Sequence, residues 1–141
     1  MRSVKEIYDY NKNNDYGKSI NEKMTYNLFA YCARQLEKDE EVIMSFVGIL
    51  YYQPSAQFTQ WYGILITEQR IIVGLAGFFN KEYVIFNRSD YHSLALSELG
   101  QHDTITFIGD EKKLNIGVAK HRSFDIYQDI LSKTSYIALT E

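Results

Sequence analysis

The order of apolar and polar residues predicts helices at both ends of the chain. One helical pattern repeats apolar residues every three or four positions: Ile20, Met24, Leu28, Tyr31, Cys32 and Leu36. This spacing predicts an amphipathic helix over about 20–37. A shorter helix is predicted over about 3–10. Ser3-x-x-Glu6 and Ser19-x-x-Glu22 both fit the capping box, in which a Ser hydroxyl and a Glu carboxylate bind the free amides of a first turn.

The middle of the chain has the pattern of β-strands. From Val42 to Tyr52 both alternating sets of positions are apolar. We therefore expect this strand to be covered on both faces, by the core on one and by the preceding helix on the other. The stretch 53–57 contains Pro54 and predicts a turn. Further β-rich stretches follow at 58–67, 70–78, 82–87, 91–96, 104–108 and 114–118.

The chain ends in another helical pattern over about 122–134, followed by the short apolar stretch Tyr136–Leu139. The predicted order is helices, about seven short strands and a final helix. This order favours a mainly β, α+β fold with an N-terminal helical segment over 1–38 and one compact unit over 39–136.

Composition and charge narrow the classes of function. The length of 141 residues fits one domain. The net charge of −3 provides no electrostatic attraction for nucleic acid, so we expect no nucleic-acid partner. The single cysteine, Cys32, cannot form an internal disulfide. The sequence shows neither an apolar leader nor a stretch long enough to span a bilayer, which takes about 20 residues. We expect a cytoplasmic protein, and its many Asn, Lys, Ile and Tyr residues suggest a bacterial or phage source.

Three stretches carry a resemblance to a known family. They are 36–43 (LEKDEEVI), 63–73 (GILITEQRIIV) and 114–118 (LNIGV), the last followed by Phe124 and the final helix. They resemble the bacterial pleckstrin-homology-like (PH-like) domains of the YokE type. The resemblance implies a barrel of about seven antiparallel strands capped by a C-terminal helix. It also implies that Thr67 and Arg70 form a structural corner, with the hydroxyl capping the turn and the guanidinium reaching carbonyls or a carboxylate.

The polar residues do not assemble into a catalytic motif. The histidines are scattered at 92, 102 and 121, without the spacing of a metal site. Cys32 lies on the apolar face of its helix, which is typical of a buried, inert thiol. The acidic residues after that helix, which we expect to form a solvated junction, are Glu37, Asp39, Glu40 and Glu41. We therefore predict no enzyme activity, no catalytic residue, no metal and no cofactor.

The predicted first hairpin is aromatic and uncharged. Phosphoinositide binding, a common function of PH domains, uses basic residues in this loop, and 51–58 contains none. Tyrosine and tryptophan are enriched at protein interfaces, and alternation along the strands leaves about half of the set exposed. The predicted partner-binding residues are Tyr51, Tyr52, Gln53, Phe58, Trp61 and Tyr62.

The leading hypothesis is a non-enzymatic interaction module that binds a protein or peptide, with homo-oligomerisation left open. A second candidate surface is the groove between the strand 91–96 and the final helix, where an extended peptide could add a strand. The alternative hypothesis is a peripheral lipid or small-ligand binder that uses the same aromatic residues and makes weak membrane contact. A third, a hydrolase or nucleotide-handling enzyme, would require a polar pocket.

Overall fold

The protein has an α+β fold in a computed structural model that describes residues 1–55, 60–77 and 79–139. Two helices, α1 (Val4–Asn14) and α2 (Glu22–Ala33), precede the strands, and α3 (Ser123–Lys133) follows the seventh strand. The strands are β1 (Val42–Leu50), β2 (Trp61–Thr67), β3 (Arg70–Ala76), β4 (Lys81–Asn87), β5 (Ser93–Ser97), β6 (Asp103–Ile108), β7 (Lys113–Val118) and β8 (Ile137–Ala138). Two short 3-10 helices are η1 (Arg88–Asp90) and η2 (Lys120–Arg122).

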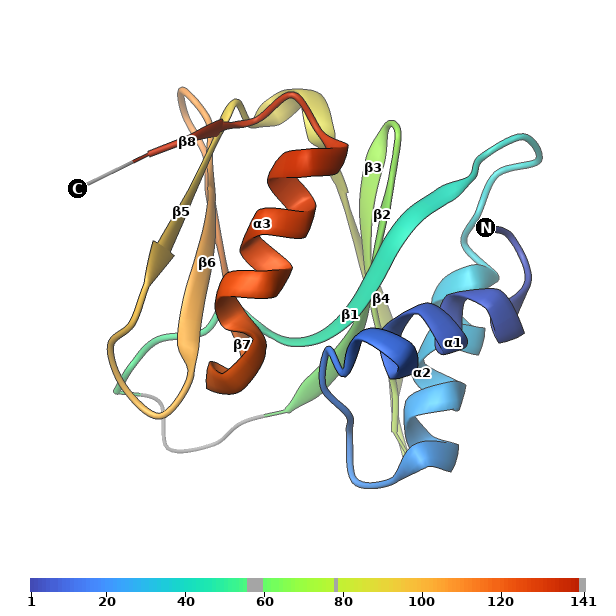
Figure 1. The fold of residues 1–141 in the computed structure, drawn as a ribbon. Coiled ribbons are helices and arrows are strands. Elements are labelled where there is room, and N and C mark those ends of the chain that lie inside the picture. The colour runs from blue at the N-terminus through green and yellow to red at the C-terminus, as the bar shows by residue number, and fades with distance from the viewer. Residues whose placement is uncertain (56–59, 78, 140–141) are drawn as a thin grey trace.

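All the strands belong to one sheet in the order β4-β3-β2-β1-β7-β6-β5-β8. Neighbouring strands are antiparallel except for β5 and β8, which are parallel. In Figure 1 the strands β1–β4 and β5–β7 stand on opposite sides of α3. Among the described residues β4 and β5 are not paired, so the sheet has two edges, β4 and β8. The seven predicted strands are present, and β8 is an eighth that the sequence pattern did not reveal.

Strand β1 joins the two halves of the sheet. Most of its length pairs with β2, whereas Ile49 and Leu50 also pair with Gly117 and Ile116 of β7. Gly48 lies at this crossing, where a Cβ atom would stand 2.6 Å from the Ile116 side chain. The absence of a side chain at Gly48 therefore lets the two strands approach closely.

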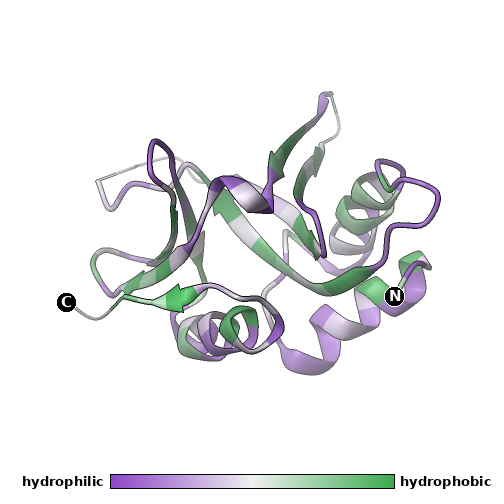
Figure 2. Cartoon of the chain, turned by 90° about the horizontal axis from the view of Figure 1, so that it is seen from above, coloured by the Kyte–Doolittle hydropathy of each residue, from purple (hydrophilic) through white to green (hydrophobic). Residues whose placement is uncertain are grey.

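The main core lies between the two halves of the sheet and is closed by α3. Phe46, Ile64 and Val73 point into it from the strands, and Ile126 and Ile130 enter it from α3; all five are fully buried. Figure 2 shows hydrophobic segments along the central strands, whereas the loops that join them are mostly hydrophilic. The final helix predicted over about 122–134 is confirmed as α3 (Ser123–Lys133).

A second core lies under α1 and α2 on the outer face of the sheet. It consists of Ile7, Phe29, Cys32, Val42, Val47, Leu65 and Ile72. Helix α1 covers β1, where the Ser45 hydroxyl donates to the Ile7 carbonyl at 2.7 Å, and α2 covers β2 and β3. The prediction that β1 is buried on both faces is confirmed. However, its outer cover is mainly α1 and not the helix that directly precedes it.

The ends of the N-terminal helices differ from the prediction. The capping box of Ser3 and Glu6 is present, but α1 continues to Asn14 and ends at Asp15, whose φ is +56°. Helix α2 is capped by Asn21, which accepts from the Met24 amide at 2.9 Å, and not by Ser19. None of the described helices is long and apolar enough to cross a membrane.

Candidate functional site

Tyr51 is an exposed aromatic residue of the first hairpin. It follows β1 directly, 60% of its surface is exposed, and its φ is +56°. A left-handed backbone costs a residue with a Cβ roughly 1–2 kcal/mol. Its ring stands edge-on to that of Phe86 on β4, with 6.4 Å between the ring centroids. The chain therefore holds an aromatic side chain at its surface in a strained conformation.

Tyr62 extends this surface across the sheet. The side chain is half-buried on the inner face of β2, and its hydroxyl donates to Glu82 Oε1 at 2.5 Å. Burial and the Glu82 carboxylate raise the pKa of Tyr62 above its usual value, and the nearby Tyr51 adds to this shift. We call the residues Tyr51, Tyr62, Glu82 and Phe86 the Tyr51 surface.

Tyr52 is buried, although it was predicted in the same group. Only 2% of its surface is exposed, and its ring packs on Gly117, where a Cβ would lie 2.6 Å from the ring. Its hydroxyl accepts a hydrogen bond from the His102 amide at 3.2 Å. The Tyr52 side chain therefore anchors the main chain of the loop between β5 and β6 to the hairpin and does not contribute to an exposed surface.

The remaining predicted partner-binding residues do not lie together on one surface. Trp61 lies on the opposite face of β2 from Tyr62, half-buried, with its ring edge-on to His102 at a centroid distance of 5.1 Å. Gln53 is exposed in the loop, and Phe58 lies outside the described residues. The predicted aromatic set therefore forms one exposed surface around Tyr51 and a separate contact between Trp61 and His102.

Thr67 and Arg70 form the structural corner that the family resemblance implied. The Thr67 hydroxyl accepts from the Arg70 amide at 2.9 Å and donates to Glu40 Oε2 at 2.7 Å. Arg70 donates through Nε to Glu40 Oε2 at 2.8 Å, and through Nη2 to the Gln35 carbonyl at 2.8 Å and to the other Glu40 oxygen. The carboxylate that the corner needs is thus supplied by Glu40.

Glu40 was expected in a solvated junction, and this expectation is wrong. Its side chain is 6% exposed because it is enclosed by the β2–β3 corner. Burial alone would raise its pKa, but hydrogen bonds from Arg70, the Glu37 backbone and Thr67 outweigh that effect and lower the pKa to about 2. The carboxylate therefore stays charged and serves the fold.

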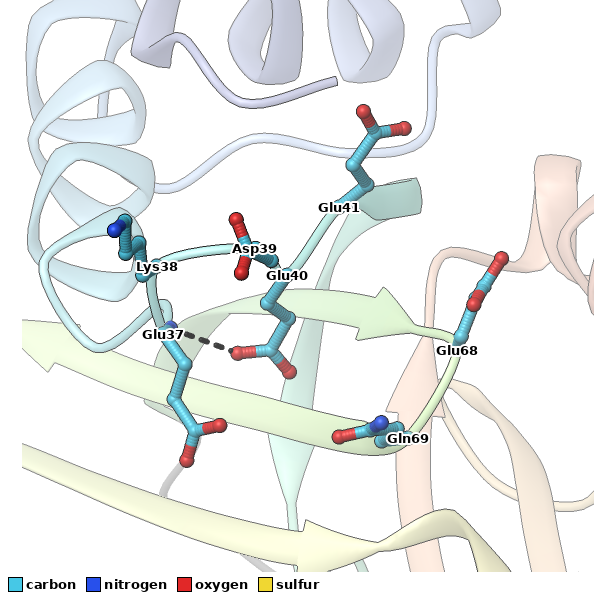
Figure 3. Close-up of a pocket in the computed structure, with 7 residues that line it drawn as sticks. All are labelled: Glu37, Lys38, Asp39, Glu40, Glu41, Glu68 and Gln69. Atoms are coloured by element: carbon cyan, nitrogen blue, oxygen red, sulfur yellow. Dashed lines mark hydrogen bonds between the residues drawn. The ribbon is translucent and has the colours of Figure 1, made fainter.

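The other acidic residues around Glu40 line a polar cavity of about 530 Å³. Figure 3 shows that the side chains of Glu41 and Glu68 point away from the Glu40 carboxylate, so the acidic groups do not converge. No group of three or more His, Cys, Asp or Glu residues in the described part of the chain is placed to hold a metal ion.

The histidines and the cysteine lie in separate environments. His92 contacts Asp110 at 3.1 Å, and His121 contacts Asp15 at 3.0 Å. Burial, together with the charge of Lys120, lowers the pKa of His102. Cys32 is fully buried, its thiol donates to the Gly63 carbonyl at 3.3 Å, and burial raises its pKa to about 12. Cys32 is thus buried as predicted.

The second predicted surface, beside β5, is occupied by the chain itself. Strand β8 pairs in parallel with Ser93 and Leu94 of β5. The Ile137 amide donates to the His92 carbonyl at 3.0 Å, and the Leu139 amide donates to the Leu94 carbonyl at 2.9 Å. An incoming peptide would have to displace this tail from that part of β5.

Comparison with known proteins yields a likeness of fold. The sequence matches no family model and no curated protein. Among solved structures, the hSac2 domain from the human phosphoinositide phosphatase Sac2 is similar with a TM-score of 0.54. The two share 13% sequence identity, and the match covers 89% of this chain and 93% of the hSac2 domain. At this identity the likeness concerns the fold alone.

Proposed function

We propose that this chain is a PH-like interaction module, without enzyme activity, that binds a protein or peptide partner through the Tyr51 surface. The observation that carries the proposal is the exposed Tyr51 ring on a left-handed backbone. Strain of this kind persists where the surrounding structure enforces it, and it is concentrated at functional sites. The strand order, the position of α3 and the fold of the hSac2 domain support the PH-like part of the proposal.

The Tyr51 surface has the chemistry of a protein contact. Tyr51, Tyr62 and Phe86 provide aromatic area with few rotatable bonds, which is typical of residues that dominate binding energy. The Glu82 carboxylate is engaged by the Tyr62 hydroxyl, and β4, which carries Glu82 and Phe86, is an edge of the sheet. This combination favours a partner that inserts an apolar side chain beside Tyr51.

The similar hSac2 domain comes from a phosphoinositide phosphatase, which raises the question whether this chain binds phosphoinositides. Recognition of their phosphates requires Lys or Arg side chains. The sequence from Tyr51 to Tyr62 contains neither residue, and the acidic group on the Tyr51 surface is Glu82. The proposal is therefore restricted to a protein or peptide partner, and lipid binding becomes an alternative outcome of the test.

A photocrosslinker at single positions tests the proposal. Tyr51→p-benzoylphenylalanine should crosslink one discrete partner in lysate of the native cells, whereas Tyr83→p-benzoylphenylalanine should not. Tyr83 is a matched control because it is also a half-exposed tyrosine. It directly follows Glu82 in β4, so its side chain lies on the opposite face of that strand. The variant Tyr51→Ala should lose at least tenfold in affinity for the partner so identified, and Tyr83→Ala should retain it.

Three results would overturn the proposal: equal crosslinking from both positions, unchanged affinity of Tyr51→Ala, or flotation of the chain with liposomes in a manner that depends on Tyr51. Crosslinking between two copies of the chain would identify the partner as the protein itself. Size-exclusion chromatography with light scattering would then have to show a dimer that Tyr51→Ala dissociates.

A further inference from the structure

Glu82 is the charged group of the Tyr51 surface, and it lacks a counter-charge. Its side chain is exposed, and among the residues that the structure describes it takes part in no ion pair. The preceding Lys81 does not compensate it, because successive side chains of a strand point to opposite faces. Oε1 of Glu82 accepts from the Tyr62 hydroxyl at 2.5 Å. An ionised carboxylate offers about four acceptor sites, so Glu82 keeps capacity for further donors.

The Tyr62 hydroxyl fixes where this carboxylate lies. The hydrogen bond joins β4 to β2 across the intervening β3, and it holds Glu82 beside the aromatic residues. Burial raises the pKa of Tyr62, and the Glu82 carboxylate and the nearby Tyr51 raise it further. Tyr51 and Glu82 therefore lie on either side of the same hydroxyl, so an exposed ring and an unpaired carboxylate belong to one surface.

A partner that covers the Tyr51 surface must also cover Glu82. Contact with purely apolar groups would remove water from the ionised carboxylate and offer nothing in exchange, which is unfavourable. A cation reverses this balance, because it pairs with the carboxylate and is also attracted to the face of an aromatic ring. Charge complementarity therefore requires a cationic group in the partner, next to the apolar side chain that packs beside Tyr51.

Among the cationic side chains, arginine fits this arrangement best. Its guanidinium is planar and weakly hydrated, so it can lie on an aromatic ring and donate to a carboxylate at the same time, whereas the lysine ammonium is compact and strongly hydrated. We propose, on the basis of the protein-binding function proposed above, that the partner presents an arginine to this surface. Its guanidinium lies on the Tyr51 ring and donates to Oε2 of Glu82.

Short synthetic peptides test the arginine without knowledge of the partner. The first probe is acetyl-Gly-Leu-Gly-Arg-Gly-amide, whose leucine and arginine lie on the same side of an extended chain because they are two positions apart. Titrated into the ¹⁵N-labelled full-length protein, it should shift the amide signals of Tyr51 and Glu82 saturably, with a Kd below about 5 mM. A second peptide carries citrulline in place of arginine, with the same shape and no charge. It should bind about fivefold more weakly.

Variants of Glu82 supply the matching test on the protein side. Glu82→Gln keeps an oxygen that can accept from Tyr62, so the fold is preserved. This variant should bind the arginine peptide only as well as the citrulline peptide, whose own affinity should not change. Glu68→Gln is the matched control, because Glu68 is an exposed glutamate at the other end of β2, and it should change neither affinity. Glu82→Lys should prefer a third peptide, with glutamate in place of arginine.

Three results would each overturn this inference: no saturable shift with the arginine peptide, equal affinities for arginine and citrulline, or equal effects of Glu82→Gln and Glu68→Gln. None of them would affect the Tyr51 crosslink, which would then identify a partner that brings no cation to Glu82. Conversely, failure of the Tyr51 crosslink together with an arginine preference that depends on Glu82 would overturn the proposed protein partner and retain the guanidinium site.

Discussion

The two ends of β2 carry hairpins of opposite character. At the β2–β3 end, Thr67 and Arg70 enclose Glu40, and every hydrogen-bonding group of the Glu40 carboxylate is satisfied within the protein. At the β1–β2 end, Tyr51 is exposed and strained, and its ring stands edge-on to that of Phe86. The cluster of charged groups at one end of β2 therefore stabilises the fold, and the aromatic residues at the other end form the surface where we propose that a partner binds.

The largest expected effect comes from breaking the Glu40–Arg70 pair. Glu40→Gln or Arg70→Met should lower the free energy of unfolding by about 3–5 kcal/mol, because each leaves a buried partner without its counter-charge. The matched control is Glu37→Gln, since Glu37 is exposed and lies 3.9 Å from Arg70. Glu37→Gln should lower the free energy of unfolding by less than about 1 kcal/mol. Urea denaturation measures all three, and equal stabilities of Glu40→Gln and Glu37→Gln would contradict a structural role for the corner.

A somewhat smaller effect is expected from pH. The pKa of Glu40 is about 2 in the folded protein against an ordinary value of 4.5. The ionised carboxylate therefore contributes its full stabilisation above the higher value and loses it as the pH falls toward 2. The free energy of unfolding of the wild type should fall by about 3 kcal/mol through this group. Unfolding free energies at a series of pH values should show the Glu40→Gln variant approaching the wild type as acid is added. A constant gap between the two across this range would mean that Glu40 is not held ionised by the corner.

The smallest effect should come from Tyr51 and have the opposite sign. Tyr51→Gly removes the penalty of the left-handed backbone and should raise stability by about 1 kcal/mol, whereas Tyr51→Ala keeps a Cβ and should not. Thermal unfolding of both variants beside the wild type measures the difference. If Tyr51→Gly is less stable than Tyr51→Ala, a Cβ at position 51 carries no backbone strain, and the contrast between the two hairpins fails.

Most of the fold could be predicted from local patterns. Alternation and turn residues located β1 to β7, and the three-to-four spacing located α3. The errors have local causes as well. The first helix was predicted to end at about residue 10, but α1 continues to Asn14, and the side-chain amide of Asn11 donates a hydrogen bond to the Gly17 carbonyl. Strand β8 has two residues, too few to show an alternating pattern.

The candidate site was harder to predict because its geometry depends on long-range contacts. The left-handed turn at Tyr51 interrupts the alternation of β1, so the sequence could not indicate that Tyr52 is the buried ring of the pair. Glu40 and Arg70 are thirty positions apart, and no periodicity links them. The one available signal was the family resemblance, which implied that Arg70 reaches carbonyls or a carboxylate without identifying either.

The sharing of β1 between both halves of the sheet has a consequence for cooperativity. Because Ile49 and Leu50 are bonded to β7 while the same strand pairs with β2, neither half can melt without disrupting the other. The domain should then unfold in a single transition. A molecule that binds near either end of the strand would, by mass action, protect residues across the whole sheet from amide hydrogen exchange.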